Sequence, residues 1–586
     1  MIQSIFNKYK KDILFLALIT AAFFTTEILF GKYFINPIID FGREAYYPEL
    51  MLKGKLLYKD LFNLFGPFAY QMNAFLYGIL GVNLSVLEMV GSFCSIIILY
   101  CTYFISRFFL SENLSLFTTV FVLITCVFSP SVFNFIFPYS YSLLYAYMFF
   151  LTSVVFFLLA LKNKEKLDLY LFISYFLIGA SLASKYEFLP FALFLLFYSI
   201  FVFKQNFLKI IANIAAITAV PAICISILFH QGVRTEDFIN NFHYIKNYLS
   251  SDSLKYFYSH TVGTLFSFGL FYKIRTIDFS ITLAFTILTC WTFYALMFST
   301  NRIKYLPECI VIGLGMLFTS IIDPSQLYMF TPYIIYILFT YKIVKCIQNK
   351  TFDLKNDLFL LILFISIIAM SKALFIIDTR IYGSFTLTIP AIAIIYFTTK
   401  ILPEINDKLK KEYLEKLVLI LLLLFSVATA QIYYNAFSEK SSHLTTNKGT
   451  VYIYPEETKA TRQLLKYIET HVTGNKTLMI IPEGVFINFI TDRELKLYNY
   501  SSLMPPYIDT YGINNIIDTI KKAKIDYIII NERDLREYNG TVTMCTDKYS
   551  DVQRTEELML CNFIKNNYSL EETLGKSFTY EIYKLK

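Results

Sequence analysis

The sequence has 586 residues, of which 56% are hydrophobic and only 16% are charged, and its formal net charge is +8. Soluble globular domains carry about 25% charged residues, and this composition excludes a disordered chain, a coiled coil, a collagen and a small disulfide scaffold. The charge is also uneven: residues 1–439 hold 33 Lys and Arg against 25 Asp and Glu, whereas residues 440–586 hold 19 of each sign. We therefore predict a membrane domain over 1–439 and a water-exposed domain over 440–586.

Apolar stretches recur through residues 1–439, and a helix needs about 20 mostly apolar residues to cross a bilayer. Hydropathy predicts thirteen spans, at about 13–35, 84–106, 114–130, 138–161, 168–184, 187–203, 207–229, 279–299, 307–322, 327–344, 357–376, 381–399 and 417–436. The first span is too long for a signal peptide, contains Glu27 and lacks a small-residue cleavage site. The expected fold class is a polytopic α-helical membrane protein with a small C-terminal α/β domain.

Lys and Arg in short loops predict the orientation, because such loops remain in the cytoplasm. They are concentrated in alternate connections, at about 8–11, 162–166, 204–209, 302–304, 342–355 and 400–416. The short loops at 129–138 and 323–326 contain none. We therefore predict a cytoplasmic N-terminus and, from the odd number of spans, an outer domain over 440–586. Because the net charge serves orientation, no nucleic-acid partner is expected.

Two outer connections, about 37–83 and 230–278, are too long to be simple links, and loops of this length are usually functional or disordered. The first begins with Asp40-Phe-Gly-Arg-Glu-Ala-Tyr-Tyr-Pro, directly after the first span. If 40–52 is helical, one face of the helix carries Asp40, Arg43, Glu44 and Tyr47. Lys59 and Asp60 follow, and Gly66-Pro67 interrupts the backbone.

A carboxylate at the membrane surface beside cations suits one chemistry well. It can accept the proton of an attacking hydroxyl or amine while the cations hold a phosphate. The alternative is an interfacial amphipathic helix whose charges simply face water.

Further candidates for phosphate binding lie at the outer ends of later spans. Lys185 stands between two apolar runs, and Arg380 has the same placement late in the chain. Arg suits bidentate phosphate binding, whereas a Lys at such a position can simply reach lipid headgroups. Lys372 and Arg275 are weaker candidates.

Residues 440–586 read as a small α/β domain. Buried strands are predicted at 477–482 and 526–531, and 578–585 alternates in a way that suits an edge strand. Helix patterns occupy about 457–471, 512–523 and 553–567, so the sheet should be partly parallel. Neither the nine cysteines nor the widely spaced histidines show a metal motif. Cys545 and Cys561 lie in this domain, where a disulfide is one option.

The first outer loop resembles that of bacterial GT-C glycosyltransferases, related to the protein O-mannosyltransferase and aminoarabinose transferase families. Those enzymes place an acidic residue after the first transmembrane helix, followed by an amphipathic helix, a Gly/Leu-Tyr-x-Asp segment and a Gly-Pro or Pro-Pro turn. The matching residues are Asp40, Gly54-Lys-Leu-Leu-Tyr-Lys-Asp60 and Gly66-Pro67. Residues 40–81 carry most of the match.

The resemblance implies transfer of a sugar from a polyprenyl-phosphate donor at the outer face of a bacterial cytoplasmic membrane. Asp40 would be the general base or would orient the acceptor, and attack would invert the anomeric carbon. Many relatives have adjacent Asp and Glu residues, whereas Asp40 and Glu44 stand four apart. This spacing leaves open which carboxylate is the base and whether a divalent metal is bound. The candidate residues are, as catalytic groups, Asp40 and Glu44 and, as substrate-binding groups, Arg43, Tyr47, Lys59, Asp60, Lys185 and Arg380.

Two other classes of function are compatible with a polytopic chain. A transporter or flippase of lipid-linked glycans usually shows internal repeats and interrupted helices in corresponding halves, and no convincing repeat is visible. A non-catalytic envelope assembly protein would favour a degenerate first loop, whereas here acids, cations and turn residues are all present. The acceptor, whether a glycan, a lipid or a protein, is left open.

Overall fold

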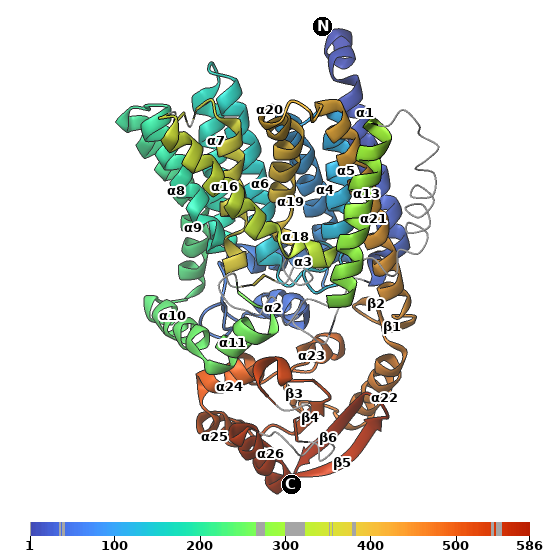
Figure 1. Ribbon diagram of the computed structural model, residues 1–586. Coiled ribbons are helices and arrows are strands. Elements are labelled where there is room, and N and C mark those ends of the chain that lie inside the picture. Colours follow the sequence, from blue (N-terminus) through green and yellow to red (C-terminus); the bar gives the residue numbers. More distant parts are fainter. Residues whose placement is uncertain are drawn as a thin grey trace.

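The computed structural model describes residues 2–33, 37, 41–264, 276–298, 323–350, 352–353, 355–374, 376–377, 383–540, 544–545 and 554–586. Figure 1 shows a bundle of roughly parallel helices, with the N-terminus at one end, and a separate domain beyond the other end that carries the C-terminus. Between them lies a layer of shorter helices. The chain therefore builds three levels along the axis of the bundle.

The bundle is built from apolar helices and short helical segments in its connections. In chain order these are α1 (Ile2–Phe30), η1 (Gly31–Tyr33), α4 (Leu84–Phe109), α5 (Glu112–Val122), η3 (Leu123–Val127), α6 (Tyr141–Lys162), α7 (Leu167–Ser184), η4 (Tyr186–Phe188), α8 (Leu189–Phe197), η5 (Tyr198–Val202), α9 (Phe207–Gln231), α13 (Thr276–Phe298), α15 (Ser325–Tyr328), α16 (Thr331–Gln348), α17 (Leu358–Ala369), η9 (Ser371–Leu374), α18 (Gly383–Thr386), α19 (Thr388–Tyr396), η10 (Phe397–Ile401), α20 (Leu402–Ile405) and α21 (Lys411–Ser438).

Nine helical stretches of the described residues are long and apolar enough to cross a membrane, and the chain is a multi-pass membrane protein. Three shorter apolar helices accompany them, at Glu112–Val127, Tyr186–Val202 and Leu358–Ala369. Each predicted span overlaps one of these helices, except 307–322, which lies outside the described residues. The total of thirteen therefore stays a prediction. In Figure 1, α20 lies at the same end of the bundle as the N-terminus, as the predicted orientation requires.

Capping side chains define where several of these helices begin. The Asn206 side chain accepts a hydrogen bond from the Lys209 N–H at 3.0 Å, and Asp357 accepts from the Leu360 N–H at 3.0 Å. Such caps satisfy backbone donors that have no partner within the helix. The polar residues between the apolar runs thus mark the helix starts as well as the ends of the spans.

The middle level consists of the two long outer connections. It contains α2 (Gly42–Leu52), α3 (Phe68–Leu80), α10 (Thr235–Ser250), α11 (Asp252–Tyr256) and η6 (Phe257–Thr261). The helix predicted over 40–52 is thus present as α2 among the described residues. Nearly all of α2 is buried, from Gly42 to Leu50, so it does not lie on the surface as an interfacial amphipathic helix would.

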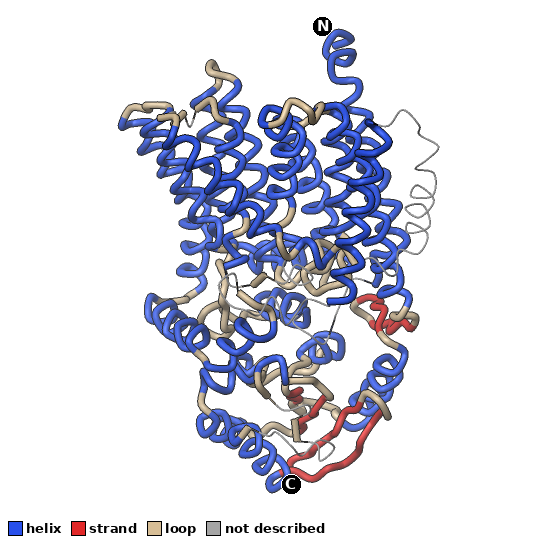
Figure 2. The backbone as a smooth tube through the Cα atoms, in the orientation of Figure 1, coloured by secondary structure: helices blue, strands red, loops and turns tan. Residues whose placement is uncertain are grey.

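The outer domain is an α/β unit whose strands are drawn red in Figure 2. Its elements are β1 (Ser442–Thr446), β2 (Gly449–Ile453), α22 (Pro455–His471), β3 (Leu478–Ile481), α23 (Val485–Thr491), η11 (Tyr498–Tyr500), α24 (Pro505–Tyr511), α25 (Ile513–Ala523), β4 (Tyr527–Asn531), η12 (Arg536–Tyr538), α26 (Thr555–Asn567), β5 (Tyr568–Gly575) and β6 (Thr579–Leu585). The strand order of the larger sheet is β3-β4-β6-β5.

The partly parallel sheet is confirmed, because β3 pairs with β4 in parallel and the other pairs are antiparallel. The edge position predicted for 578–585 is wrong: β6 lies between β4 and β5. Hydropathy did not reveal β5 because half of its residues are exposed. β6 therefore pairs with β4 on one side and with β5 on the other, and β5 is the edge strand.

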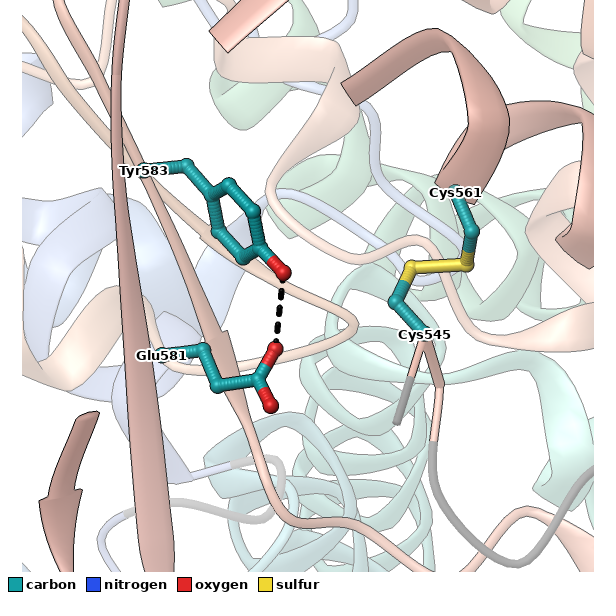
Figure 3. Close-up of a disulfide and its surroundings, with 4 residues drawn as sticks. All are labelled: Cys545, Cys561, Glu581 and Tyr583. Atoms are coloured by element: carbon teal, nitrogen blue, oxygen red, sulfur yellow. Dashed lines mark hydrogen bonds between the residues drawn. A yellow bond between two sulfur atoms is a disulfide. The ribbon is translucent and has the colours of Figure 1, made fainter. Parts of the chain in front are cut away.

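A disulfide joins Cys545 to Cys561 of α26, with their Cα atoms 5.1 Å apart (Figure 3). In the same view, the Tyr583 hydroxyl of β6 donates a hydrogen bond of 2.9 Å to the Glu581 carboxylate. The sequence left this cysteine pairing open, and the structure shows it formed. The bond attaches the chain after η12 to the helix that precedes β5.

A buried charge cluster joins the outer domain to the first outer loop. Lys448, in the turn between β1 and β2, lies 2.8 Å from the Glu49 carboxylate of α2 and 2.6 Å from Asp492. Lys53 reaches the same Glu49 carboxylate at 2.7 Å, but its side chain is half exposed. The Leu84 N–H of α4 donates to the Lys448 carbonyl at 2.9 Å. One residue thus contacts the outer domain, the outer loop and a membrane helix.

The two lysines around Glu49 give a matched test of this attachment. Replacing Lys448 with Met leaves a buried carboxylate with less compensation, and we expect a loss of about 3 kcal/mol of stability. Lys53→Met removes an exposed partner and should change stability by no more than about 0.5 kcal/mol. Thermal unfolding of both purified variants in the same detergent measures the difference. Equal melting temperatures for the two variants would contradict the attachment.

Candidate functional site

A cavity of about 450 Å³ lies where the bundle, both outer loops and the outer domain meet. The membrane helices and their connections contribute Tyr139, Lys185, Tyr186, Glu187 and Lys372, and the first outer loop contributes Arg43, Leu64 and Phe65. The second outer loop contributes Tyr248, Leu249, Leu254, Phe257 and Tyr258, and the outer domain contributes Glu483, Tyr507, Arg533, Glu537 and Tyr538. All three levels of the molecule therefore contribute residues to the lining of the cavity.

Two lysines share one carboxylate at the membrane end of this cavity. The Lys185 ammonium lies 3.2 Å from Glu187 Oε1, and the Lys372 ammonium lies 2.7 Å from the same oxygen. Lys185 follows the end of α7 and has an extended backbone (φ −156°, ψ 136°), and its side chain is 6% exposed. In this group of three, two positive charges face one negative charge. Ammonium groups form strong hydrogen bonds to anionic oxygens.

The pKa of Lys185 is lowered to about 8, first by burial and then by the Lys372 charge, against the opposing effect of Glu187. Burial disfavours the charged form of a lysine because the ammonium loses water. A phosphate placed beside Lys185 would favour its charged form, because an adjacent negative charge stabilises an ammonium. The Lys185 ammonium is therefore a group whose protonation depends on what occupies the cavity.

The Gly66-Pro67 turn brings the first outer loop against the end of α7. The Gly66 N–H donates to the Ser184 carbonyl at 3.0 Å, and a Cβ on Gly66 would lie 2.1 Å from the Ala183 carbonyl oxygen. Only glycine fits such a close approach of two backbones. The preceding residue, Phe65, then lies over Lys185, whose ammonium is 4.5 Å from the ring centroid. The turn predicted from sequence thus positions an aromatic ring in the cavity.

Arg43 of α2 connects three walls of the cavity. Its guanidinium donates to the Tyr507 hydroxyl of the outer domain and, at 3.2 Å, to the Tyr139 hydroxyl that precedes α6. It also lies 4.0 Å from the Glu483 carboxylate and 5.5 Å from the centroids of both tyrosine rings. The planar, permanently charged guanidinium suits this combination of ring stacking and hydrogen bonds.

Three of the residues that the sequence placed on one helix face, Arg43, Glu44 and Tyr47, have different partners in the structure. Arg43 lines the cavity, whereas Glu44 is fully buried beside it and accepts hydrogen bonds from the Tyr70 hydroxyl at 2.8 Å and the Tyr141 N–H at 2.9 Å. The Tyr47 hydroxyl bonds Ser501 Oγ of the outer domain at 2.9 Å. These contacts join α2 to α3, α6 and the outer domain.

Lys59 and Asp60 do not line the cavity. The Asp60 carboxylate accepts the Leu56 N–H at 2.8 Å, which closes the local turn, and Lys59 is exposed. Three other candidates, Asp40, Arg275 and Arg380, lie outside the described residues.

Sequence reasoning missed most of the cavity wall. Glu187 stands two residues after Lys185. An acidic residue this close to a lysine at the predicted outer face could have indicated that Glu187 belongs to the same site. Tyr507, Arg533 and Glu537 had no comparable signal, because a contact such as Arg43 to Tyr507 spans 464 residues. Among the described residues, no group of three or more His, Cys, Asp or Glu side chains is arranged to hold a metal ion.

The fold and the cavity define a multi-pass membrane protein with a charged chamber at its predicted outer face, and solved structures of similar arrangement exist. One is the archaeal oligosaccharyltransferase AglB from Archaeoglobus fulgidus, in complex with an inhibitory peptide and a dolichol-phosphate (TM-score 0.48, 10% identity, 89% of this chain and 69% of that chain). Another is ArnT from Cupriavidus metallidurans bound to undecaprenyl phosphate (TM-score 0.46, 10% identity, 98% of both chains). ArnT in its apo state matches with a TM-score of 0.44 at 10% identity, over 97% of both chains.

These likenesses concern the arrangement of the helices alone. At such TM-scores and identities they assign no activity and no residue role to this chain. No protein-family model and no curated protein sequence matches it.

Two glycines of the same loop test the close approach at α7. Gly66→Ala should cost about 1–3 kcal/mol, because the new methyl group collides with the Ala183 carbonyl. Gly78→Ala adds a methyl group 3.6 Å from Leu52 in an exposed turn of α3, and it should keep or raise stability by up to about 1 kcal/mol. The melting temperature of Gly66→Ala should therefore fall, whereas that of Gly78→Ala should stay the same or rise. A shared shift in one direction would refute the geometry of the turn.

Proposed function

We propose that this protein is a GT-C-type glycosyltransferase that moves a sugar from a polyprenyl-phosphate donor to an acceptor at the outer face of a bacterial cytoplasmic membrane. The observation that carries the proposal is the pair of lysines that share Glu187 at the membrane end of the cavity. A lipid phosphate has its charge at the membrane surface and its chain in the bilayer. Lys185 directly follows the candidate span Leu167–Ser184, and Lys372 closely follows the apolar helix Leu358–Ala369, which suits such a ligand.

The lysine pair would bind the donor phosphate and stabilise it as it leaves. During transfer, the acceptor oxygen or nitrogen forms a bond to the anomeric carbon, and the bond from that carbon to the phosphate oxygen breaks. The electron pair stays on the phosphate, where fixed ammonium groups stabilise the increased negative charge. Attack from the face opposite the phosphate inverts the anomeric configuration. Arg380 is proposed as a further phosphate ligand.

Asp40 is the proposed general base, which takes the acceptor proton or orients the acceptor. It precedes Phe41 and Gly42, at the start of the helix that carries Arg43 into the cavity. Glu44 is better suited to a positioning role, since its carboxylate already accepts two hydrogen bonds in a fully buried setting. Arg43 would contact the transferred sugar or the acceptor, while Tyr47, Lys59 and Asp60 would shape the loop around the substrate.

Removing the proposed base tests the reaction directly. Asp40→Asn should reduce transfer from polyprenyl-phosphate sugars by about 10²–10⁴-fold, the usual contribution of a positioned base. Asp168→Asn is the matched control, because Asp168 begins α7 at the opposite end of the helix from Lys185 and forms a half-exposed pair with Lys209. Release of free polyprenyl phosphate by purified protein is the readout.

Full transfer by the Asp40 variant would show that another group is the base. Movement of intact donor across vesicles without release of polyprenyl phosphate would instead identify a transporter.

The Lys185 ammonium should make donor binding dependent on pH. With its pKa lowered to about 8, Lys185 is charged below that pH and neutral above it, so the donor KM should rise as the pH rises through about 8. Lys185→Met should raise KM at pH 7 and abolish the rise near pH 8, and it should lower kcat because the ammonium that stabilises the leaving phosphate is lost. Lys209→Met, at the far end of the bundle, should keep the wild-type profile. An unchanged profile in the Lys185 variant would remove this lysine from the donor site.

A further inference from the structure

Helix α10 (Thr235–Ser250) presents three distinct sides, although it lies outside the candidate membrane spans. Its inward side is held to the first outer loop by a reciprocal amide pair. The Asn241 side chain donates to the Asn63 carbonyl at 2.9 Å and accepts from the Asn63 N–H at 3.3 Å. On the same side, Tyr248 packs on Tyr507, with ring centroids 4.9 Å apart. These contacts determine which residues of α10 face outward.

One outward side of α10 is an apolar stripe. Ile239 is 50% exposed, Phe242 is 65% exposed and Leu249 is 55% exposed. With the exposed Lys246 between them, these residues repeat at intervals of three, four and three, which aligns them along one line of a helix. The neighbouring outward side is polar and carries Asn240, His243 and Asn247, all exposed. A helix with this division fits the boundary between lipid and water.

The stripe continues the lipid-facing surface of the preceding helix. Phe229, near the end of the candidate span Phe207–Gln231, is exposed, and its ring lies 5.6 Å from that of Phe238 in α10. Phe238 stands four residues before Phe242 on the helix. The contact between Phe229 and Phe238 therefore links the exposed apolar residues of α9 to those of α10.

The other end of the stripe reaches the mouth of the cavity. Leu249 lines the cavity and is also exposed. Tyr186 of η4 likewise lines the cavity and is 57% exposed. Both residues therefore lie at the border between the cavity and the exposed surface. Lys185, next to Tyr186 in the chain, also lines the cavity and is buried.

We propose that α10 lies in the outer leaflet of the membrane, with Ile239, Phe242 and Leu249 in lipid, and that it forms one lip of a lateral entrance for the isoprenoid chain of the donor. Tyr186 forms the opposite lip. The chain remains in the apolar layer along the stripe while the phosphate reaches Lys185. Lys246 extends from the stripe to lipid phosphates at the surface. The role of the entrance rests on the proposed function, whereas the membrane position of α10 does not.

The single tryptophan of the chain makes the position of α10 directly measurable. Trp291 is replaced by Phe, and Phe242→Trp or Asn240→Trp then introduces one reporter on the apolar or the polar side. In nanodiscs with brominated phospholipids, the Phe242→Trp fluorescence should be quenched by lipid and protected from iodide. The Asn240→Trp fluorescence should show the reverse. Leu249→Trp is a second reporter for the apolar side.

Two outcomes would overturn the membrane position. Quenching of both reporters by iodide alone would place the whole outward surface in water. Protection of Phe242→Trp from both quenchers would show that a second copy of the chain or another protein covers the stripe.

The entrance is tested separately by donor chain length. Leu249→Ser should raise the KM for a long-chain polyprenyl-phosphate sugar about tenfold, because a hydroxymethyl group replaces most of an apolar side chain at the lip. The KM for a donor with two isoprene units should stay unchanged, as should both values in the control Asn247→Ser. An unchanged long-chain KM in Leu249→Ser would refute the entrance. Absence of any transfer by the wild-type protein would refute the proposed function, and the fluorescence would still decide where α10 lies.

Discussion

The arrangement of this molecule depends on one constraint: buried charges at the end of the membrane bundle must be compensated. An ammonium removed from water is costly unless an opposite charge or hydrogen bonds replace the lost hydration. Lys185 meets this condition through Glu187, which it shares with Lys372 from a segment more than 180 residues later. The carboxylate therefore fixes the outer end of α7 relative to η9. Lys185, Glu187 and Lys372 line the cavity at this position.

The same condition explains how the outer domain is attached. Arg43 and Glu49 both belong to α2, and each pairs with groups of the outer domain: Arg43 with Tyr507 and Glu483, Glu49 with Lys448. A short buried helix thus carries charges of both signs toward the same domain. These pairs are specific in direction as well as in charge, since hydrogen bonds to fixed tyrosine and carboxylate oxygens define an orientation. These contacts hold the outer domain as one wall of the cavity.

Much of the architecture was readable because membranes impose simple rules. Uninterrupted apolar stretches predicted the helices, and alternating Lys and Arg content predicted which ends lie together. Lys185 was found because charges are rare at the outer ends of the spans, and Gly66-Pro67 because this pair interrupts a helix. Glu44 and Asp60 show where such reasoning stops. Both stand in the conspicuous loop, yet one carboxylate holds Tyr70 and Tyr141 and the other closes a turn on Leu56. The sequence does not distinguish a carboxylate that contacts substrate from one that accepts hydrogen bonds within the protein.

By itself, the sequence determined the membrane class of the chain, the division into an apolar and a water-exposed part, and most of the helices. These properties follow from local composition and periodicity, which act over tens of residues. Only the tertiary structure decided that Arg43, Lys185, Lys372 and Tyr507 share one chamber, that β6 lies inside its sheet, and that Phe65 covers Lys185. Such placements depend on contacts between residues hundreds of positions apart, where a side chain is selected by the shape and charge of its partner and leaves no periodic trace along the chain.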